Sequence, residues 1–539
     1  MRGLPRRAAD RRLSRRAVDG SLLALTVGAT ALYLPLPTRW LRYGTVHVAP
    51  DGFDGFPGST RRLAVRSLQR AVDLAESGET VLIWPGTYHE SVRVRRGGRP
   101  GRPLVLRAAE PGKAVISGAT ATPVARSWRW RSLGGRRWVT ATGWRVDGLR
   151  VDGVPAYRAT RRGKLEEVCR RPGAWPAFFA TDRRLDLCLP SGGPPRAERF
   201  TVQRPGALRT RSGGHQVASL WLEAPWVEVR DLVFEHPVFA AIQLWDTAHV
   251  RLEGNVFRGA DVAINDRPTL RVASDIAIRH NLADAWPLAR WRSSGWLSWK
   301  EIYHYSNSSL VWLRGEDLRV EHNLIGEAGD GIKLVPQGGG NTAAANVIGA
   351  AVDDAFEVDD RARGLSLARN LVADAFVMLS FSPMSEGSVR VSDNVFLGLP
   401  DPLDTSSSVL LKLLVDSVDE VQLDHNLFVG GGLGWNPPTV RLRHLRLVDN
   451  TLASVRGARD LAARDRILGP GNRIVRLLPG GWPPAAAGPA ALEPLLGPVR
   501  PLAIPRPGPT WLQPGMDPAF DRLQPLLRSG WIVPAPPAP

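Results

Sequence analysis

Cysteine and lysine are both scarce in this chain of 539 residues. The two cysteines, Cys169 and Cys188, are too few for a disulfide-based scaffold or for a cysteine-based zinc cluster. The five lysines leave arginine to carry almost all of the positive charge, and the formal net charge is +18. This excess indicates a polyanionic partner or a general bias toward arginine, and composition alone leaves both explanations open.

Near its N-terminus the chain also lacks an apolar run that is clearly long enough to cross a bilayer as a helix. Residues 21–37 are uncharged and lie at the short limit for a membrane-spanning helix. They follow the arginine-rich residues 1–20, an arrangement typical of an export signal or an uncleaved signal anchor. We therefore expect a periplasmic or cell-surface protein, anchored in the cytoplasmic membrane by residues 21–37. That oxidising compartment would allow Cys169 and Cys188 to form a disulfide.

Short segments of alternating apolar residues recur through the chain from residue 227 onward. Each contains Asn or Asp followed by two or three mostly apolar residues, as in VRLEGNVF (250–257) and LRVEHNLI (318–325). Most repeats are 23 to 26 residues apart, which predicts a solenoid of stacked short strands. We expect the polar residues to form a buried ladder at one corner; they are Asp231, Asn255, Asn281, Asn323, Asn346, Asn370, Asn394, Asn426 and Asn450.

These repeats, together with TVHVAPDG (45–52) and TVLIWPGTY (80–88), resemble exported members of the right-handed parallel β-helix superfamily, the pectate-lyase-like proteins. The resemblance implies an all-β solenoid with an N-terminal capping helix at about residues 67–78. Its cap and first coils would occupy residues 45–118, and its main part residues 220–478. Residues 119–219 break the period and predict a β-rich insertion. The proline-rich residues 479–539 predict an extended tail that either lies on the solenoid or hangs free.

The densest acidic segment is DDAFEVDD, residues 353–360. Asp330 precedes Asp353 and Asp354 by about one coil, so these carboxylates should be stacked neighbours. If Phe356 and Val358 point inward, Glu357 and Asp359 project from the outer face, as does Lys333 one coil earlier. Clustered carboxylates must share protons, pair with cations or bind a metal ion.

Three reactions and one non-catalytic role fit this acidic cluster. A glycoside hydrolase needs a protonated acid and a carboxylate. The DG…DD arrangement resembles the first two motifs of polygalacturonase-type hydrolases, although Ala328-Gly329 precede Asp330 and no Arg-x-Lys follows. A uronate lyase or epimerase needs a base and a neutralising cation. The alternative is an envelope protein that only binds or scaffolds glycan.

Residues in named roles follow from these hypotheses. The catalytic candidates are Asp330, Lys333, Asp354, Glu357 and His304, and Lys333, Tyr305 or His304 would be the base of a lyase or epimerase. The substrate-binding candidates are Gln243, Trp245, Tyr305 and Arg361. A Ca²⁺ ion, if one binds, would lie on Asp353, Glu357 and Asp359. We expect a monomer whose partners are an acidic polysaccharide and the membrane, and not nucleic acid.

Overall fold

The computed structural model describes residues 44–532 except 121–123, 173–174, 197–198, 204–217, 238, 261, 267–270, 306–308, 382–383, 399–407, 414–416, 419, 436–440, 443, 457–466, 479–484 and 500–506. The side chains of 303–305, 361, 384–386, 417–418, 435 and 441–442 also lie outside the described part. Residues 21–37 are among those left out, so the expected signal or anchor stays a prediction. No helix among the described residues is both long and apolar enough to cross a membrane.

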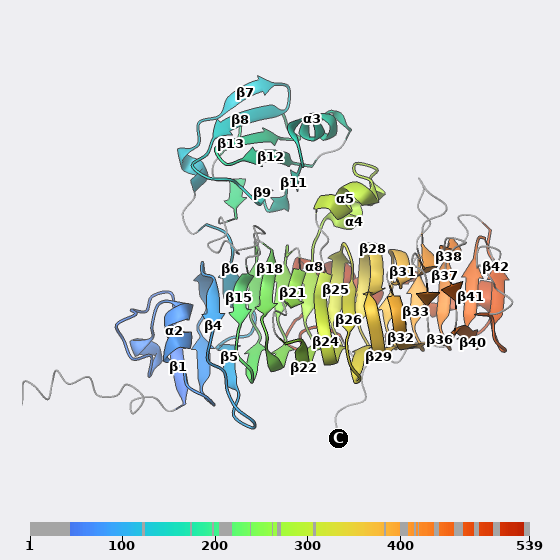
Figure 1. Ribbon diagram of the computed structural model, residues 1–539. Helices are drawn as coiled ribbons and strands as arrows, with labels where there is room; N and C mark the ends of the chain where they lie inside the picture. The colour runs from blue at the N-terminus through green and yellow to red at the C-terminus, as the bar shows by residue number, and fades with distance from the viewer. Residues whose placement is uncertain are drawn as a thin grey trace, which may run out of the picture. The chain divides into compact units, whose positions relative to one another are not determined.

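Three rows of parallel strands stack side by side along the solenoid (Figure 1). The first row contains β1 Thr45–Val48, β2 Thr80–Ile83, β5 Leu104–Ala108, β16 Val227–Arg230, β19 Ala248–Glu253, β22 Ala273–Arg279, β24 Ser309–Glu321, β27 Asn341–Ala344, β29 Asp360–Ala368, β32 Met384–Ser392, β36 Val421–Asp424 and β40 Leu445–Val448.

The second row follows the first along each coil. It contains β3 Gly86–Tyr88, β6 Ala114–Ser117, β17 Val233–Glu235, β20 Val256–Arg258, β23 Leu282–Asp284, β25 Leu324–Ala328, β28 Val347–Val358, β30 Leu371–Val372, β33 Val395–Leu397, β37 Leu427–Gly430, β41 Thr451–Ser454 and β42 Arg473–Arg476.

The third row completes the coil. It contains β4 Val92–Val94, β15 Ala218–Leu222, β18 Ala240–Leu244, β21 Val262–Asp266, β26 Ile332–Pro336, β31 Ala375–Ser380, β34 Val409–Lys412 and β38 Gly432–Trp435. The start of β24 and the end of β28 also belong to it, because these two long strands turn a corner without a break.

The interior is filled by apolar columns that the strand register aligns. In the first row Leu252 lies opposite Ile278, which lies opposite Val320, and all three are fully buried. Alternate residues such as Arg251 face outward. A single coil could not bury its inner residues, so stacking supplies the hydrophobic core.

The predicted asparagine ladder is confirmed. Nδ2 of Asn323 donates to Oδ1 of Asn346 at 3.0 Å, and the same bond joins Asn346 to Asn370 at 3.0 Å and Asn370 to Asn394 at 2.9 Å. These asparagines are at most 1% exposed. The ladder begins at Asn255 and reaches Asn472.

The assignment of Asp231 to the ladder is wrong by one position. Val233 pairs with Val256, so Leu232 occupies the place that Asn255 holds in the next coil. Asp231 takes the preceding position, where the backbone has positive φ (61°), as it has at His280 (53°) and His322 (56°). The rings of these two histidines stack with centroids 5.1 Å apart, so they are turn residues rather than catalytic groups.

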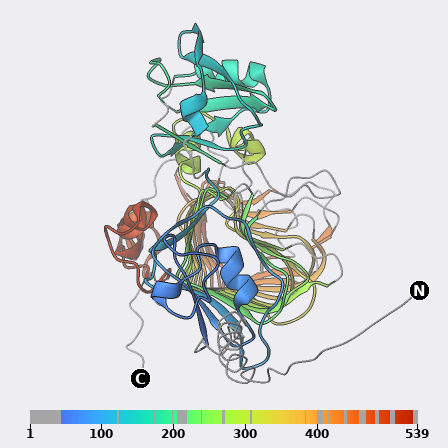
Figure 2. The same cartoon turned by 90° about the vertical axis from the view of Figure 1, so that its left-hand side faces the viewer.

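The predicted capping helix is α2, Leu68–Leu74. Its N-terminus is capped by the Ser67 side chain, which accepts a hydrogen bond from the backbone N–H of Arg70. Leu68, Ala71 and Val72 turn inward and belong to the same core as the strands. In Figure 2, α2 lies over the open end of the first coils. It thereby covers apolar side chains that an uncapped solenoid would expose.

The insertion, residues 119–219, forms two small sheets of its own. One contains β10 Val154–Pro155, β9 Leu149–Val151 and β14 Phe200–Val202. The other contains β11 Tyr157–Arg158, β12 Ala177–Thr181, β13 Arg184–Cys188, β8 Arg137–Ala141 and β7 Arg131–Gly134, beside α3 Arg162–Arg170. Cys169 in α3 and Cys188 in β13 form a disulfide with their Cα atoms 6.0 Å apart.

The C-terminal segment is more ordered than its proline content predicts. It forms α7 (Glu493–Leu496) and α8 (Pro518–Leu527), and Trp531 is fully buried. Phe520, Leu523 and Trp531 pack on an apolar stripe outside the coils, which contains Val256, Leu282, Leu324, Val347, Leu371 and Val395. Each stripe residue directly follows a ladder asparagine. The segment therefore covers the one apolar outer face that the repeats themselves create.

Candidate functional site

Several irregular features of the described solenoid lie at the corner between the second and third rows, where they could form a site. The insertion leaves this corner between β6 and β15, and an excursion with α4 (Leu288–Ser293) and α5 (Trp299–Tyr305) leaves it between β23 and β24. Asp330 lies at the same corner between β25 and β26, and Asp353 and Asp354 lie there within β28. Stacking of the coils therefore brings side chains from segments that are distant in the sequence to one corner.

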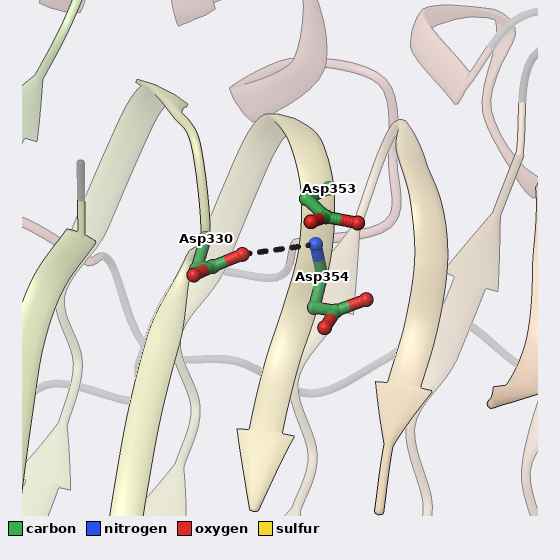
Figure 3. Close-up of side chains that lie close together, drawn as sticks. All are labelled: Asp330, Asp353 and Asp354. Atoms are coloured by element: carbon green, nitrogen blue, oxygen red, sulfur yellow. Dashed lines mark hydrogen bonds between the residues drawn. The ribbon is translucent and has the colours of Figure 1, made fainter. Parts of the chain in front are cut away.

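Asp330, Asp353 and Asp354 form a compact trio (Figure 3). One carboxylate oxygen from each lies within 4.8 Å of those of the other two, and their residues are 1%, 4% and 1% exposed. The backbone N–H of Asp354 donates to Oδ1 of Asp330 at 3.3 Å. Oδ1 of Asp353 and Oδ1 of Asp354 accept no hydrogen bond from any described residue. Buried oxygens of this kind are rare and indicate a proton, a cation or a ligand.

Local backbone features allow this crowding. The pairing of β28 with β31 shifts register between Ala351 and Asp354, which locally breaks the regular alternation of side chains. Gly331 is required because a Cβ there would lie 2.4 Å from the carbonyl oxygen of Ala355 in the next coil. The DG…DD motif thus encodes a tight corner as well as the carboxylates.

Lys333, Glu357 and Asp359 form a second cluster on the outer face. Lys333 pairs with Glu357 in the strand register, and its Nζ lies 2.7 Å from Glu357 Oε2 and 3.1 Å from Asp359 Oδ2. The outward direction predicted for all three is confirmed, with side chains 11%, 14% and 18% exposed. The proposed Ca²⁺ set of Asp353, Glu357 and Asp359 is divided, because two of its members are already paired with an ammonium group.

Lys412 completes the site, and the sequence analysis did not assign it a role. It lies in the outward column of the third row that runs from Lys333 through Glu357 and Ser380. Its Nζ lies 2.9 Å from Oδ2 of Asp354 and 4.0 Å from Oδ1 of Asp353. Of only five lysines in an arginine-rich chain, Lys333 and Lys412 form ion pairs with these acids and the charge of Lys300 acts on Asp353, so the scarcity of lysine was the available signal.

Burial and mutual repulsion raise the pKa values of the aspartates. Burial, followed by the charges of Glu357, Asp354 and Asp353, raises the pKa of Asp330 well above its ordinary value. Burial and the Asp353 carboxylate raise the pKa of Asp354 to about 7, in spite of Lys412. Burial also raises the pKa of Asp353. The trio therefore retains a proton near neutral pH.

The lysines are fixed in their charged form. The carboxylates of Glu357 and Asp359 overcome the opposing effect of burial and raise the pKa of Lys333 above its ordinary value. Asp354 and Asp353 do the same for the pKa of Lys412. A lysine that holds its proton this firmly is a poor general base, so the base role considered for Lys333 has no support in its surroundings.

The excursion packs beside the trio. Trp291, Trp296 and Ile302 cluster with Val352, the neighbour of Asp353 in β28. Arg292 donates to Oδ2 of Asp374 at 2.9 Å, so this acid of the next corner is paired with the excursion. Trp299 stacks on Phe376 at 4.7 Å between ring centroids. The tryptophans thus line one side of the trio, and most of their surface is buried by packing.

The structure places the expected substrate-binding residues in different surroundings. Gln243 lies in the outward column but is fully buried, and it exchanges hydrogen bonds with Asn265 at 2.9 and 3.1 Å. Gln243 therefore offers no accessible amide to a substrate, against its expected substrate-binding role. Trp245 is half-buried, with its ring 5.6 Å from that of Trp221. The side chains of His304, Tyr305 and Arg361 lie outside the described residues.

Comparison with known proteins gives short sequence matches and broad structural ones. No family model matches the chain. An uncharacterised Bacillus subtilis protein, YwoF, is 40% identical over 73 residues, and pectate lyase PEL9 of Emericella nidulans is 36% identical over 75 residues. Each match covers 14% of this chain, and they span only 15% and 18% of the relatives' own lengths.

Solved structures with similar architecture include the xylose complex of XylC and pectate lyase Pel9A. The first is 13% identical with a TM-score of 0.48, covering 76% of this chain and 75% of XylC. The second is 11% identical with a TM-score of 0.33, covering 85% of each chain. The parallel rows and the ladder give this chain the fold of a right-handed parallel β-helix.

Proposed function

We propose that this β-helix is an enzyme that cleaves a polysaccharide, and that Asp330, Asp353 and Asp354 are its catalytic residues. The observation that carries the proposal is a buried trio of carboxylates in which two oxygens accept no hydrogen bond from the described residues. One carboxyl group that keeps a proton beside another that is ionised supplies the acid and the base of glycoside hydrolysis.

Hydrolysis fits the site better than β-elimination does. Elimination needs a base that removes a proton from the sugar ring, and both lysines of the site are held protonated by their acidic partners. Hydrolysis instead needs a proton donor for the leaving oxygen, which the raised pKa values of Asp330 and Asp354 provide. Water activated by an ionised aspartate would complete the reaction.

An acidic polysaccharide is the proposed substrate. Trp312 is 38% exposed in the outward column, and Nζ of Lys333 lies 5.1 Å from the centre of its ring. The exposed aromatic face suits stacking of a sugar ring, whereas Lys333 is already paired with Glu357 and Asp359 and adds no free positive charge. The short likeness to a pectate lyase, an enzyme named for such a polymer, supports the same substrate class.

The trio also has the donor chemistry for a hard cation such as Ca²⁺. Three carboxylates within 4.8 Å are oxygen ligands of the kind that Ca²⁺ prefers. Lys412 competes for the same oxygens, because its Nζ lies 2.9 Å from Asp354. If Ca²⁺ binds, it should raise the melting temperature of the wild type and not that of Asp353→Asn.

Export is part of the proposal. The arginine-rich N-terminus with the apolar residues 21–37 would direct the chain out of the cytoplasm and hold it at the membrane. The disulfide between Cys169 and Cys188 supports an oxidising compartment. Extracellular polysaccharide would be accessible there.

A substrate screen tests the reaction. Purified protein is incubated with polygalacturonate, alginate and a neutral glucan, and reducing ends and unsaturated products are measured together. Reducing ends without unsaturated products are the expected result on an acidic polymer. Unsaturated products would show that the reaction is elimination and not hydrolysis. The absence of products from every acidic polymer would contradict the proposal that the protein is an enzyme.

A further inference from the structure

Positive charge is concentrated in the insertion. Residues 119–219 contain 20 of the 70 Lys and Arg but only 7 of the 52 Asp and Glu, which gives +13 of the net charge of +18. Residues 1–43 carry +7, so the whole β-helix with its C-terminal segment is left at −2. A general bias toward arginine would charge both parts alike. The concentration therefore belongs to the insertion itself.

The insertion presents these arginines on its surface. Arg131, Arg137 and Arg184 share one face of the five-stranded sheet, because Arg131 lies opposite Val139, and Arg184 lies opposite Ala141. The other face is the apolar core of the insertion. Among the described residues of the insertion, nine arginines are exposed: Arg126, Arg129, Arg131, Arg145, Arg161, Arg162, Arg170, Arg183 and Arg196.

The acids of the insertion neutralise only part of this surface. Asp186 pairs with Arg184 at 2.7 Å and with the exposed Arg162 at 3.7 Å, and Asp147 pairs with the exposed Arg145 at 3.2 Å and with Arg158 at 3.5 Å. Among the described residues, no acid lies within ion-pair distance of the exposed Arg129, Arg131 or Arg183. Their guanidinium groups can bind carboxylates of a ligand in the bidentate manner that arginine favours.

The insertion is also tied to the excursion beside the carboxylate trio. Arg171 donates to both carboxylate oxygens of Glu301 in α5, at 2.9 and 3.0 Å, and Lys164 pairs with the same side chain. Tyr157 packs edge-on against Trp291 and Trp296 of the excursion, at 6.0 and 5.8 Å. A ligand bound to the insertion would therefore be bound to a part of the chain that contacts the tryptophan-rich excursion beside the trio.

We propose that the arginine-rich insertion, which contacts the excursion beside the carboxylate trio, is a separate binding site for an acidic polysaccharide. The choice of a polysaccharide rests on the proposed function and on the disulfide within the insertion, which belongs to an oxidising compartment where nucleic acid is not the expected partner. The acids of the site outnumber the lysines that act on them: five carboxyl groups face Lys333, Lys412 and, at Asp353, Lys300. This excess of acids disfavours a polyanion, and the insertion would supply the attraction.

Binding is measured in the Asp354→Asn background, so that cleavage does not consume the ligand. The probes are polygalacturonate, a neutral dextran, duplex DNA and phosphatidylglycerol vesicles. The test variant carries Arg129→Gln, Arg131→Gln and Arg183→Gln. The matched control removes three exposed arginines of the β-helix by Arg62→Gln, Arg66→Gln and Arg446→Gln.

We expect polygalacturonate to bind and dextran not to bind, with affinity that falls as salt increases. The insertion variant should lose about tenfold in affinity at low salt, and the control should lose less than twofold. Equal losses in both variants would overturn the proposal. Binding of DNA or vesicles without binding of polygalacturonate would also overturn it. If the insertion variant loses binding and the parent protein cleaves no polymer, the result would support the binding site in the insertion and contradict the proposed enzymatic function.

Discussion

Lys412 Nζ lies 2.9 Å from Oδ2 of Asp354, although 58 residues separate the two in the sequence. The pair joins two coils that are not adjacent, because β31 lies between β28 and β34 in the third row. Among the described residues, Lys412 is the only cation in ion-pair contact with Asp354, which belongs to the carboxylate trio. The protonation of the trio should therefore depend on this lysine.

Replacing Lys412 with Met should destabilise the protein in a pH-dependent manner. The buried carboxylates would lose their cation, and we expect a loss of about 3–5 kcal/mol in the free energy of unfolding at pH 8. At pH 5 the loss should be smaller, because protonation removes the charge that the lysine compensated. Urea unfolding of Lys412→Met, with Lys412→Arg as control, measures both. A loss that is independent of pH would show that only packing was removed.

The raised pKa of Asp354 predicts how the stability of the wild type compares with that of Asp354→Asn. The pKa is about 7 in the folded protein against an ordinary 3.8, so the folded state binds this proton more tightly than the unfolded state does. The stabilising effect of that proton is complete below pH 4 and disappears as the pH rises to about 7. The stability difference, wild type minus variant, should fall over this range. A difference that rises with pH would mean that Asp354 is ionised throughout.

The ladder makes a prediction that concerns the fold alone. Asn370 donates from Nδ2 to the carbonyl of Ala343 and to Asn394 Oδ1, and its own Oδ1 accepts from the backbone and side chain of Asn346. Asn370→Leu should leave these buried groups without partners and cost at least about 1–3 kcal/mol. Ser366→Leu, on the outer side of the same coil, is the control. Equal stability of the two variants would contradict the structural role of the ladder.

The disulfide should stabilise the insertion. Cys169 and Cys188 close a loop across 19 positions of sequence, and the chain-entropy model gives about 3 kcal/mol for a loop of that length. The double variant Cys169→Ala/Cys188→Ala should expose the insertion to proteases while the β-helix resists them. Thiol titration of the denatured, unreduced wild type should detect no free thiol, and two free thiols would contradict the pairing.

The sequence was sufficient to predict the parts of the fold that repeat. Period and alternation identified the coils, the ladder and the direction of Lys333 and Glu357, because each coil meets the same physical demand as its neighbour. The misassignment of Asp231 arose because Leu232 fills the ladder position in that coil, and an acid beside it resembled the pattern.

The parts that do not repeat were harder to predict. Lys412 joins the site across a coil in which the ladder spacing is 32 residues, so no fixed spacing indicated it. Gln243 alternates outward as expected, yet Asn265 satisfies its amide and the pair is buried. The proline-rich C-terminal segment gave no periodic signal, although the stripe after each ladder asparagine, such as Leu324 and Leu371, required a cover.

The most direct test of the central claim compares cleavage of polygalacturonate by the wild type, Asp330→Asn and Asp354→Asn. Asp393→Asn is the matched control, since Asp393 is an exposed turn residue at the ladder corner. We expect kcat/KM to fall by about 10²–10⁴-fold in the two trio variants and to stay within twofold in the control, with all four proteins folded. Equal cleavage by Asp354→Asn and Asp393→Asn would contradict the assignment of the trio as the catalytic site.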